Sequence, residues 1–125
     1  MRRITNAVDP ERMRDLLERV PRACIAFNSA GIVELVPVEF RLQEGRYWIG
    51  VSGESGPVPG PDEPVKLLID EGMYYFDMRG IWIRGQTLLS EERPEGGSPF
   101  LNWFQLVPEK FVAWDFGAMR EVEDQ

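Results

Sequence analysis

Residues 23–51 have the sequence ACIAFNSAGIVELVPVEFRLQEGRYWIGV. This segment contains three runs rich in apolar residues, at 23–28, 32–42 and 47–51. Gly31 and Gly45 stand between the runs, where tight turns favour a residue that tolerates positive φ. Three strands joined by short turns form an antiparallel meander, which is typical of a β-sandwich or a β-barrel.

The middle run, 32–42, predicts one continuous strand. Its even-numbered residues share a face: Ile32, Glu34, Val36, Val38, Phe40 and Leu42. Pro37 lies on the opposite face and has no N–H to donate to a ladder. We therefore expect an edge, a bulge or a bound ligand at Pro37.

The residues before this segment predict one amphipathic helix. Asp9 suits the cap and Pro10 suits the first helical position. An apolar stripe follows at helical spacing: Met13, Leu16, Leu17 and Val20. Pro21 ends the helix, which we expect to cover one end of the sheet.

The residues after the segment predict more strands, at 65–69, 73–89, 100–107 and 111–114. The run 73–89 fits a long strand or a bent pair, with Gly80 and Gly85 as positions for a bulge or a corner. The stretch 52–61 has three prolines and three glycines and must be a loop. Both ends of the chain, Arg2 with Arg3 and the acidic tail 121–125, are expected to be frayed.

Charge and length restrict the class of protein. The chain has 125 residues and predicts one domain, 1–125. Its net charge is −7, from 14 basic and 21 acidic residues, so we do not expect nucleic acid as a partner. Neither a signal peptide nor an apolar stretch of bilayer length is visible. We expect a cytoplasmic protein without a membrane partner.

The absence of histidine restricts the chemistry further. It excludes histidine bases, Ser-His-Asp triads and histidine metal ligands. With Cys24 as the single cysteine, neither a disulfide nor a structural zinc site is expected, and we assign no metal ligand. The apolar neighbours of Cys24 predict a small core residue. The paired carboxylates lie in turns or loops and do not suggest acid–base catalysis, so no catalytic residue is assigned.

Three motifs, in this order along the chain, resemble the pyridoxamine-phosphate-oxidase-like family of FMN-binding proteins. The first is the helix followed by a glycine turn and the strand VPVEF at 36–40. The second is YFDMRGIWIRG at 75–85, and the third is PEKFVAWD at 108–115. The resemblance implies a mainly β protein with a six-stranded antiparallel split barrel of Greek-key type, one N-terminal helix, and assembly into a homodimer. It also implies FMN or a deazaflavin in the groove between the two subunits.

The resemblance also implies positions for cofactor-binding residues. The backbone at Val36, Pro37 and Val38 would face the ring system. The hydroxyls of Ser52 and Ser55 would lie near the phosphate. Trp114 would lie near the groove or the partner chain, and Trp103 is a further candidate for the groove.

One region departs from the family. Family members carry a helix rich in lysine and arginine after the strand that matches 47–51, and this helix binds the phosphate. Here the Gly/Pro loop replaces it, with Glu54, Asp62 and Glu63 and no basic residue before Lys66. Charge-assisted contacts are worth roughly 1.5–3 kcal/mol each, so their loss weakens phosphate binding unless other groups replace them.

One basic residue is a candidate for that replacement, and two arginines are candidates for a side chain that faces the groove. Lys66 is either a phosphate ligand or a lysine that protects the edge of a sheet. Arg79 and Arg84 are five residues apart and fall on opposite faces of a regular strand, so one of them, with Arg84 the candidate, points toward the ligand.

Two functions stay open. The first is an oxidoreductase that depends on a flavin or deazaflavin and acts on a small molecule. The second is a cofactor-free split-barrel dimer that binds another small molecule or has a structural or regulatory role.

Overall fold

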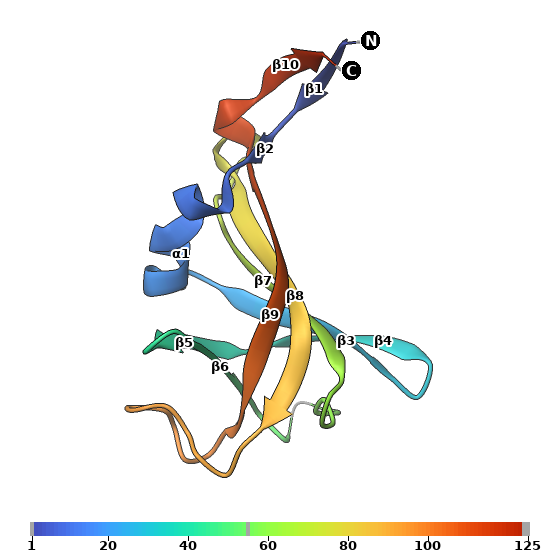
Figure 1. The fold of residues 1–125 in the computed structure, drawn as a ribbon, viewed down its shortest axis with the longest axis vertical. Coiled ribbons are helices and arrows are strands. Elements are labelled where there is room, and N and C mark those ends of the chain that lie inside the picture. The colour runs from blue at the N-terminus through green and yellow to red at the C-terminus, as the bar shows by residue number, and fades with distance from the viewer. Residues whose placement is uncertain (1, 55, 124–125) are drawn as a thin grey trace.

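The strands form one strongly curled antiparallel sheet and a small two-stranded arm (Figure 1). This computed structural model describes residues 2–54 and 56–123, in which the large sheet has eight strands. Seven strands lie in the order β4-β3-β7-β8-β9-β6-β5, and β2 pairs with the C-terminal end of β9. The bounds of the eight are β2 Ala7–Val8, β3 Ala23–Ser29, β4 Ile32–Pro37, β5 Glu39–Gln43, β6 Arg46–Val51, β7 Pro64–Glu71, β8 Arg79–Leu89 and β9 Asn102–Asp115. The mainly β, barrel-like class with one N-terminal helix is confirmed, but the expected count of six strands is wrong.

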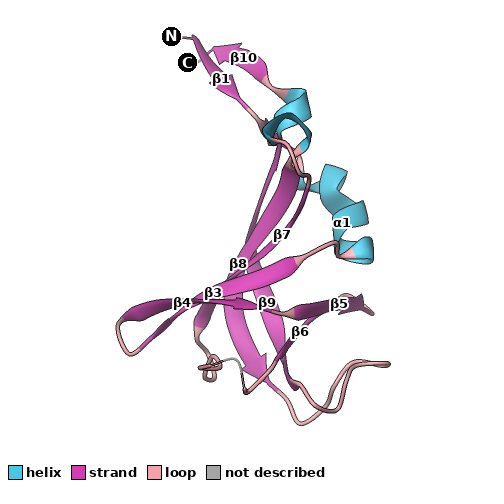
Figure 2. Ribbon diagram, turned by 180° about the vertical axis from the view of Figure 1, so that it is seen from behind, coloured by secondary structure: helices cyan, strands magenta, loops and turns pink. Residues whose placement is uncertain are grey.

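The N-terminal helix is where the sequence predicts it. It consists of the 3₁₀ turn η1 (Pro10–Met13) and the helix α1 (Arg14–Arg19). The Asp9 carboxylate accepts the Glu11 N–H at 2.9 Å and caps the first turn. The helix covers one end of the concave face of the sheet (Figure 2). The predicted stripe faces the core: Met13 and Leu16 are buried, and Leu17 and Val20 are half-buried against it. None of the helices in the described residues has the length and apolar content that crossing a membrane requires.

The predicted strand 32–42 is broken at Val38. The Val38 N–H donates to the Ala23 carbonyl oxygen at 3.1 Å, and the chain turns there from β4 into β5. Among the described strands β4 pairs only with β3, so Pro37 lies in an edge strand that does not need its missing N–H. The alternation conceals this corner because Val36 and Phe40, on either side of it, are both buried.

The strand predicted at 73–89 begins only at Arg79. The residues before it form a loop with the 3₁₀ turn η2 (Tyr75–Asp77). Asp77 closes this turn, because its carboxylate accepts the Tyr74 N–H at 2.9 Å. The aromatic run therefore belongs to an exposed loop and not to the sheet.

The two strands predicted at 100–107 and 111–114 are one strand, β9. Pro108 does not interrupt it, because the register with β8 shifts there. Arg84 pairs with Lys110 and Gly85 with Pro108, which leaves Glu109 as the extra residue of a β-bulge. The bulge predicted at Gly85 is confirmed.

Gly80 and Gly85 are required for different reasons. A Cβ on Gly85 would overlap the backbone carbonyl of Val107. Gly80 pairs regularly with Trp114, without a bulge, and a Cβ there would lie 2.5 Å from the Trp114 indole. Gly80 therefore makes room for the indole.

The two ends of the chain pair with each other and are not frayed as expected. β1 (Arg2–Thr5) and β10 (Arg120–Glu123) form the antiparallel arm, and the 3₁₀ turn η3 (Phe116–Ala118) joins β9 to it. Residues 124–125 of the predicted tail lie outside the described residues. Neither end has an apolar alternation, so only the pairing of distant segments produces these strands.

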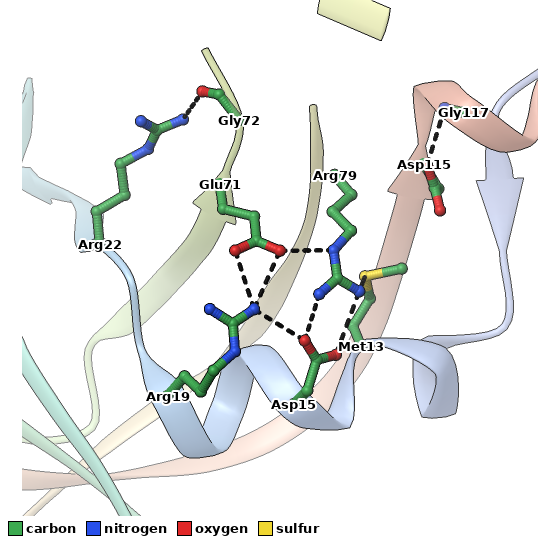
Figure 3. Close-up of polar contacts among 9 residues, drawn as sticks. All are labelled: Met13, Asp15, Arg19, Arg22, Glu71, Gly72, Arg79, Asp115 and Gly117. Carbon is green, nitrogen blue, oxygen red and sulfur yellow. Dashed lines mark hydrogen bonds and ion pairs between the residues drawn. The ribbon is translucent and has the colours of Figure 1, made fainter. Parts of the chain in front are cut away.

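A network of charged side chains attaches the helix to the sheet (Figure 3). Arg79 of β8 bonds to Asp15 of α1, and its Nε lies 2.7 Å from the Glu71 Oε1 of β7. Arg19 of α1 donates to Asp15 and Glu71, both at 2.9 Å. Each carboxylate therefore lies between two guanidinium groups. The hydrogen bond from Arg79 holds the pKa of Asp15 below its ordinary value, and the one from Arg19 does the same for Glu71.

We predict that Gly85→Ala lowers the free energy of unfolding by about 2–3 kcal/mol, because the new methyl group meets backbone that cannot move aside. Urea unfolding followed by tryptophan fluorescence measures the loss. Gly60→Ala is the matched control, since a Cβ there lies 3.7 Å from its nearest neighbour. Its effect should stay within about 0.5 kcal/mol. Equal effects of the two substitutions would contradict the role assigned to the bulge.

We predict that Arg79→Gln lowers the free energy of unfolding at pH 7 by about 1–2 kcal/mol. The free energy of unfolding of this variant should also depend less on pH in the acidic range. Asp15 and Glu71 have folded pKa values below their ordinary values of 3.8 and 4.5. The network therefore stabilises the fold above those ordinary values, and the stabilisation is lost as the pH falls through the lowered ones. Urea unfolding between pH 3 and pH 7 tests this. Arg12→Gln, on an exposed residue of η1, is the control and should follow the unsubstituted protein.

Candidate functional site

The outer face of the sheet, turned away from the helix and the core, carries the most distinctive polar surface. Along β7 and β8 the odd-numbered residues point into the core, as the burial of Leu67 and Ile83 shows. The even-numbered residues point outward and include Lys66 and Arg84. Lys66, the candidate phosphate ligand, and Arg84, the candidate for the groove, therefore share a face.

Three cations form one cross-strand row on this face. Lys66 of β7 pairs with Arg84 of β8, and Arg84 pairs with Lys110 of β9. All three side chains are exposed. We call this row of Lys66, Arg84 and Lys110 the cationic strip. Directly opposite partners in a sheet lie roughly 5 Å apart at Cβ, so the three charges are close neighbours.

Trp82 lies beside the strip and contacts both of its lysines. The Lys66 Nζ is 4.2 Å from the centroid of the Trp82 ring, and the Lys110 Nζ is 5.9 Å from it. Both distances are within the range of a cation–π interaction. The indole therefore keeps two ammonium groups together on the outer face.

The cationic strip has no counter-charge within the described chain. No described residue forms a hydrogen bond or an ion pair with the side chain of Lys66, Arg84 or Lys110. Asp70, the carboxylate nearest along β7, is occupied by Arg22 at 2.8 Å. Opposed like charges destabilise a sheet, and this row occurs in a chain whose net charge is −7. The strip is thus a local concentration of uncompensated positive charge.

Two more of the predicted residues lie on the same face. Pro37 is exposed in the next cross-strand row, which runs from Pro37 through Cys24 and Leu68 to Trp82. Trp114 lies in the following row, half-buried, with its indole over Gly80. At about 4.8 Å per strand, the span from Pro37 to Trp82 is roughly 14 Å. The face thus joins aromatic and apolar surface to a group of cations.

Other predicted residues lie elsewhere. The Val36 side chain is buried and that of Val38 is half-buried, both against the core, so only the backbone of these residues is available to a ligand. Ser52 follows β6, whose last residue, Val51, pairs with Asn102. Lys110 is eight residues further along β9, roughly 25 Å away at about 3.3 Å per residue. Ser55 lies outside the described residues.

The Gly/Pro loop after β6 is fastened by hydrogen bonds of its own. The buried Thr87 of β8 accepts the Glu63 N–H at 3.0 Å and donates to the Gly60 carbonyl oxygen. The Glu63 carboxylate accepts the Gly60 N–H at 2.6 Å, and Ser52 accepts the Glu54 N–H at 3.3 Å. The N–H groups of Glu54, Gly60 and Glu63 therefore already have acceptors within the protein.

Four single-residue interpretations are settled by the fold. Lys66 does not protect an edge, because β7 pairs with β3 on one side and β8 on the other. Arg79 points toward the helix and Arg84 outward, as the five-residue spacing predicts. Trp103 is buried outside the core cluster, beside the 94–98 loop, and its indole N–H donates to the Ser98 carbonyl at 2.7 Å, so it is not open to a ligand. Cys24 is half-buried on the outer face and not in the core; burial raises the pKa of its thiol.

Sequence reasoning missed Lys110, because residues 108–110 were interpreted as a connection. A signal was present in the apolar pattern of β9. Phe104 and Leu106 point inward with even numbers, and Ala113 points inward with an odd number. Such a change of phase indicates one extra residue between them.

Comparison with solved structures identifies the fold. A FAD-binding protein of Mycobacterium smegmatis superposes with a TM-score of 0.63 and 14% identity, over 90% of this chain and 96% of that protein. A conserved hypothetical protein of Mycobacterium tuberculosis gives 0.69 and 16%, over 90% and 88%. A candidate pyridoxamine 5'-phosphate oxidase of Corynebacterium glutamicum gives 0.61 and 15%, over 88% and 90%. No protein-family model matches the sequence, and no curated protein is significantly similar to it.

These likenesses show the fold. The chain has the split-barrel fold shared by these solved structures, and the predicted resemblance to the pyridoxamine-phosphate-oxidase-like proteins is confirmed at the level of the fold. The shared architecture covers nearly the whole chain.

We predict that Arg84→Gln raises the melting temperature by about 2 °C at low ionic strength, because it removes the middle one of three like charges. Added salt screens the repulsion, so the gain should shrink as the salt concentration approaches about 0.5 M. Thermal unfolding followed by circular dichroism at several salt concentrations measures both effects. A melting temperature that falls at low salt would show that Arg84 has a stabilising partner.

Proposed function

We propose that the chain binds a flavin-type cofactor, FMN or a deazaflavin, on the outer face of the sheet, and that it is an oxidoreductase acting on a small molecule. The single observation that carries the proposal is the cationic strip of Lys66, Arg84 and Lys110 without a counter-ion. The strip would hold the anionic tail of the cofactor. It would replace the basic phosphate-binding helix, which this chain lacks.

The surface beside the strip suits a planar ring system. Trp82 and Trp114 supply aromatic surface, and Pro37 with its neighbouring backbone supplies an apolar edge. The span of roughly 14 Å across these strands accommodates a ring and a phosphorylated side chain together. When bound, the flavin supplies the hydride chemistry. The protein positions the ring, binds the tail and covers one face, and none of these tasks needs histidine.

The proposal includes a homodimer in which a second copy closes the outer face. An exposed single sheet face shields a ring from water on one side only. The edge strand β4 supports this assembly, because its outward residues Val33 and Leu35 are 73% and 71% exposed. Apolar side chains on an open edge favour contact with another chain.

One observation favours the second function, a cofactor-free binding protein. The Gly/Pro loop after β6 carries carboxylates, and its Gly60 N–H donates to the Glu63 carboxylate while the Glu63 N–H donates to Thr87. It therefore does not form a phosphate cradle of its own. In this alternative the cationic strip binds a different small anion.

We predict that the protein quenches the fluorescence of FMN or a deazaflavin with a dissociation constant of about 1–10 μM, and that Lys110→Ala weakens binding about tenfold. Arg93→Ala is the control, because Arg93 is exposed on a distant loop, and its effect should be under about twofold. Sedimentation velocity on the same samples should show a dimer.

Three outcomes separate the alternatives. Saturable quenching that depends on Lys110 supports the cofactor proposal. Binding that is equally strong in Lys110→Ala places the cofactor elsewhere. Absence of quenching by either cofactor, with tight binding of an unrelated dianion at the strip, favours the second function.

A further inference from the structure

A cleft of about 510 Å³ lies on the opposite side of the sheet, between the helix and the β5–β6 hairpin. Its floor and sides are Leu17 of the helix, Leu42 of β5 and Ile81 of β8. Ile81 is 1% exposed, so the cleft reaches the hydrophobic core. Protein interiors normally close such gaps, and this volume is within the range of small-molecule sites.

Aromatic rings form one wall of the cleft. Tyr47 and Phe111 line it with ring centroids 6.1 Å apart, and the ring centroid of Phe40 lies 6.1 Å from that of Tyr47. The Tyr47 hydroxyl forms no hydrogen bond with a described residue. Burial raises the pKa of this phenol, so it stays neutral at physiological pH and can donate or accept one hydrogen bond.

The mouth of the cleft has a negative balance. Asp9, Glu11 and Glu18 line it against one cation, Arg14. Arg14 is already paired with Glu11 at 3.0 Å, and Asp9 caps the first turn. Glu18 has neither a hydrogen bond nor an ion pair with any described residue. Among the described residues, Asp9 and Glu18 therefore have no cation partner at the mouth, and only the Glu18 carboxylate is also without a hydrogen bond.

We propose that this cleft binds a small organic cation, an amine with an apolar body, and that it is a second ligand site separate from the outer face. The apolar body lies against Leu17 and Leu42. The ammonium group lies between the face of the Tyr47–Phe111 wall and the Glu18 carboxylate. Aromatic rings attract cations through their negative faces, so the wall and the mouth select the same sign of charge. The cleft thus takes a cation, whereas the cationic strip takes an anion.

The test is an NMR titration of the full chain with benzylamine, benzyl alcohol and benzoate, which share one ring and differ in charge. We expect benzylamine to bind with a dissociation constant of about 1 mM or lower. The amides of Leu17, Leu42, Gly45 and Tyr47 should shift. Benzyl alcohol should bind about fivefold more weakly, and benzoate more weakly still.

A matched pair of surface variants tests the carboxylate. Glu18→Gln should reduce benzylamine affinity about threefold and leave benzyl alcohol unchanged. Glu109→Gln, an exposed glutamate on β9 outside the cleft, should change neither. Leu42→Trp, which fills the cleft, should abolish all shifts; Glu18→Gln keeps the proposal testable if that variant does not fold.

Three results would overturn the inference. These are equal affinity for the three compounds, shifts centred on Lys66 and Arg84 instead of the cleft, and no binding up to about 10 mM. Because the reporting amides differ from those of the outer face, failure here leaves the cofactor proposal untouched.

Discussion

The bulge at Glu109 determines how the central strands present their side chains. Without the extra residue, Lys110 would have the same inward phase as Phe104 and Leu106, and its ammonium group would be buried in the core. With it, Phe111 and Ala113 face inward, and Lys110 stands outward beside Arg84. Gly85 makes this possible, because no side chain fits against the Val107 carbonyl. One backbone irregularity thus keeps a 14-residue strand amphipathic and completes the cationic strip.

Two groups of charged residues differ in whether they have partners within the fold. Arg79, Arg19, Asp15 and Glu71 satisfy one another and fasten the helix across the end of the sheet. The strip has no such compensation, and neither does Glu18 at the mouth of the cleft. An uncompensated exposed charge costs little in water but offers a ligand a ready partner. The outer face therefore carries uncompensated positive charge, and the mouth of the cleft carries uncompensated negative charge.

Local sequence predicted those elements whose signals are local. Asp9 and Pro10 define the start of the helix, and Met13 with Leu16 defines its buried face. Strands β3 and β6 also follow their apolar runs. The corner at Val38 and the continuity of β9 through Pro108 were missed, because alternation stays favourable across the first and proline suggests a break at the second. The arm was missed because β1 and β10 are held only by each other.

For the candidate site, the sequence by itself determined the fold class and named Lys66, Arg84, Pro37 and Trp114, since each stands in a motif or an alternating run. It also determined the absence of histidine and with it the chemistries that need one. Only the tertiary structure decided that Lys66, Arg84 and Lys110 are neighbours, that Ser52 is remote from them, and that a cleft opens under the helix. The physical reason is that register between strands far apart in the chain depends on core packing and on a single bulge. Neither is visible in any short stretch of residues.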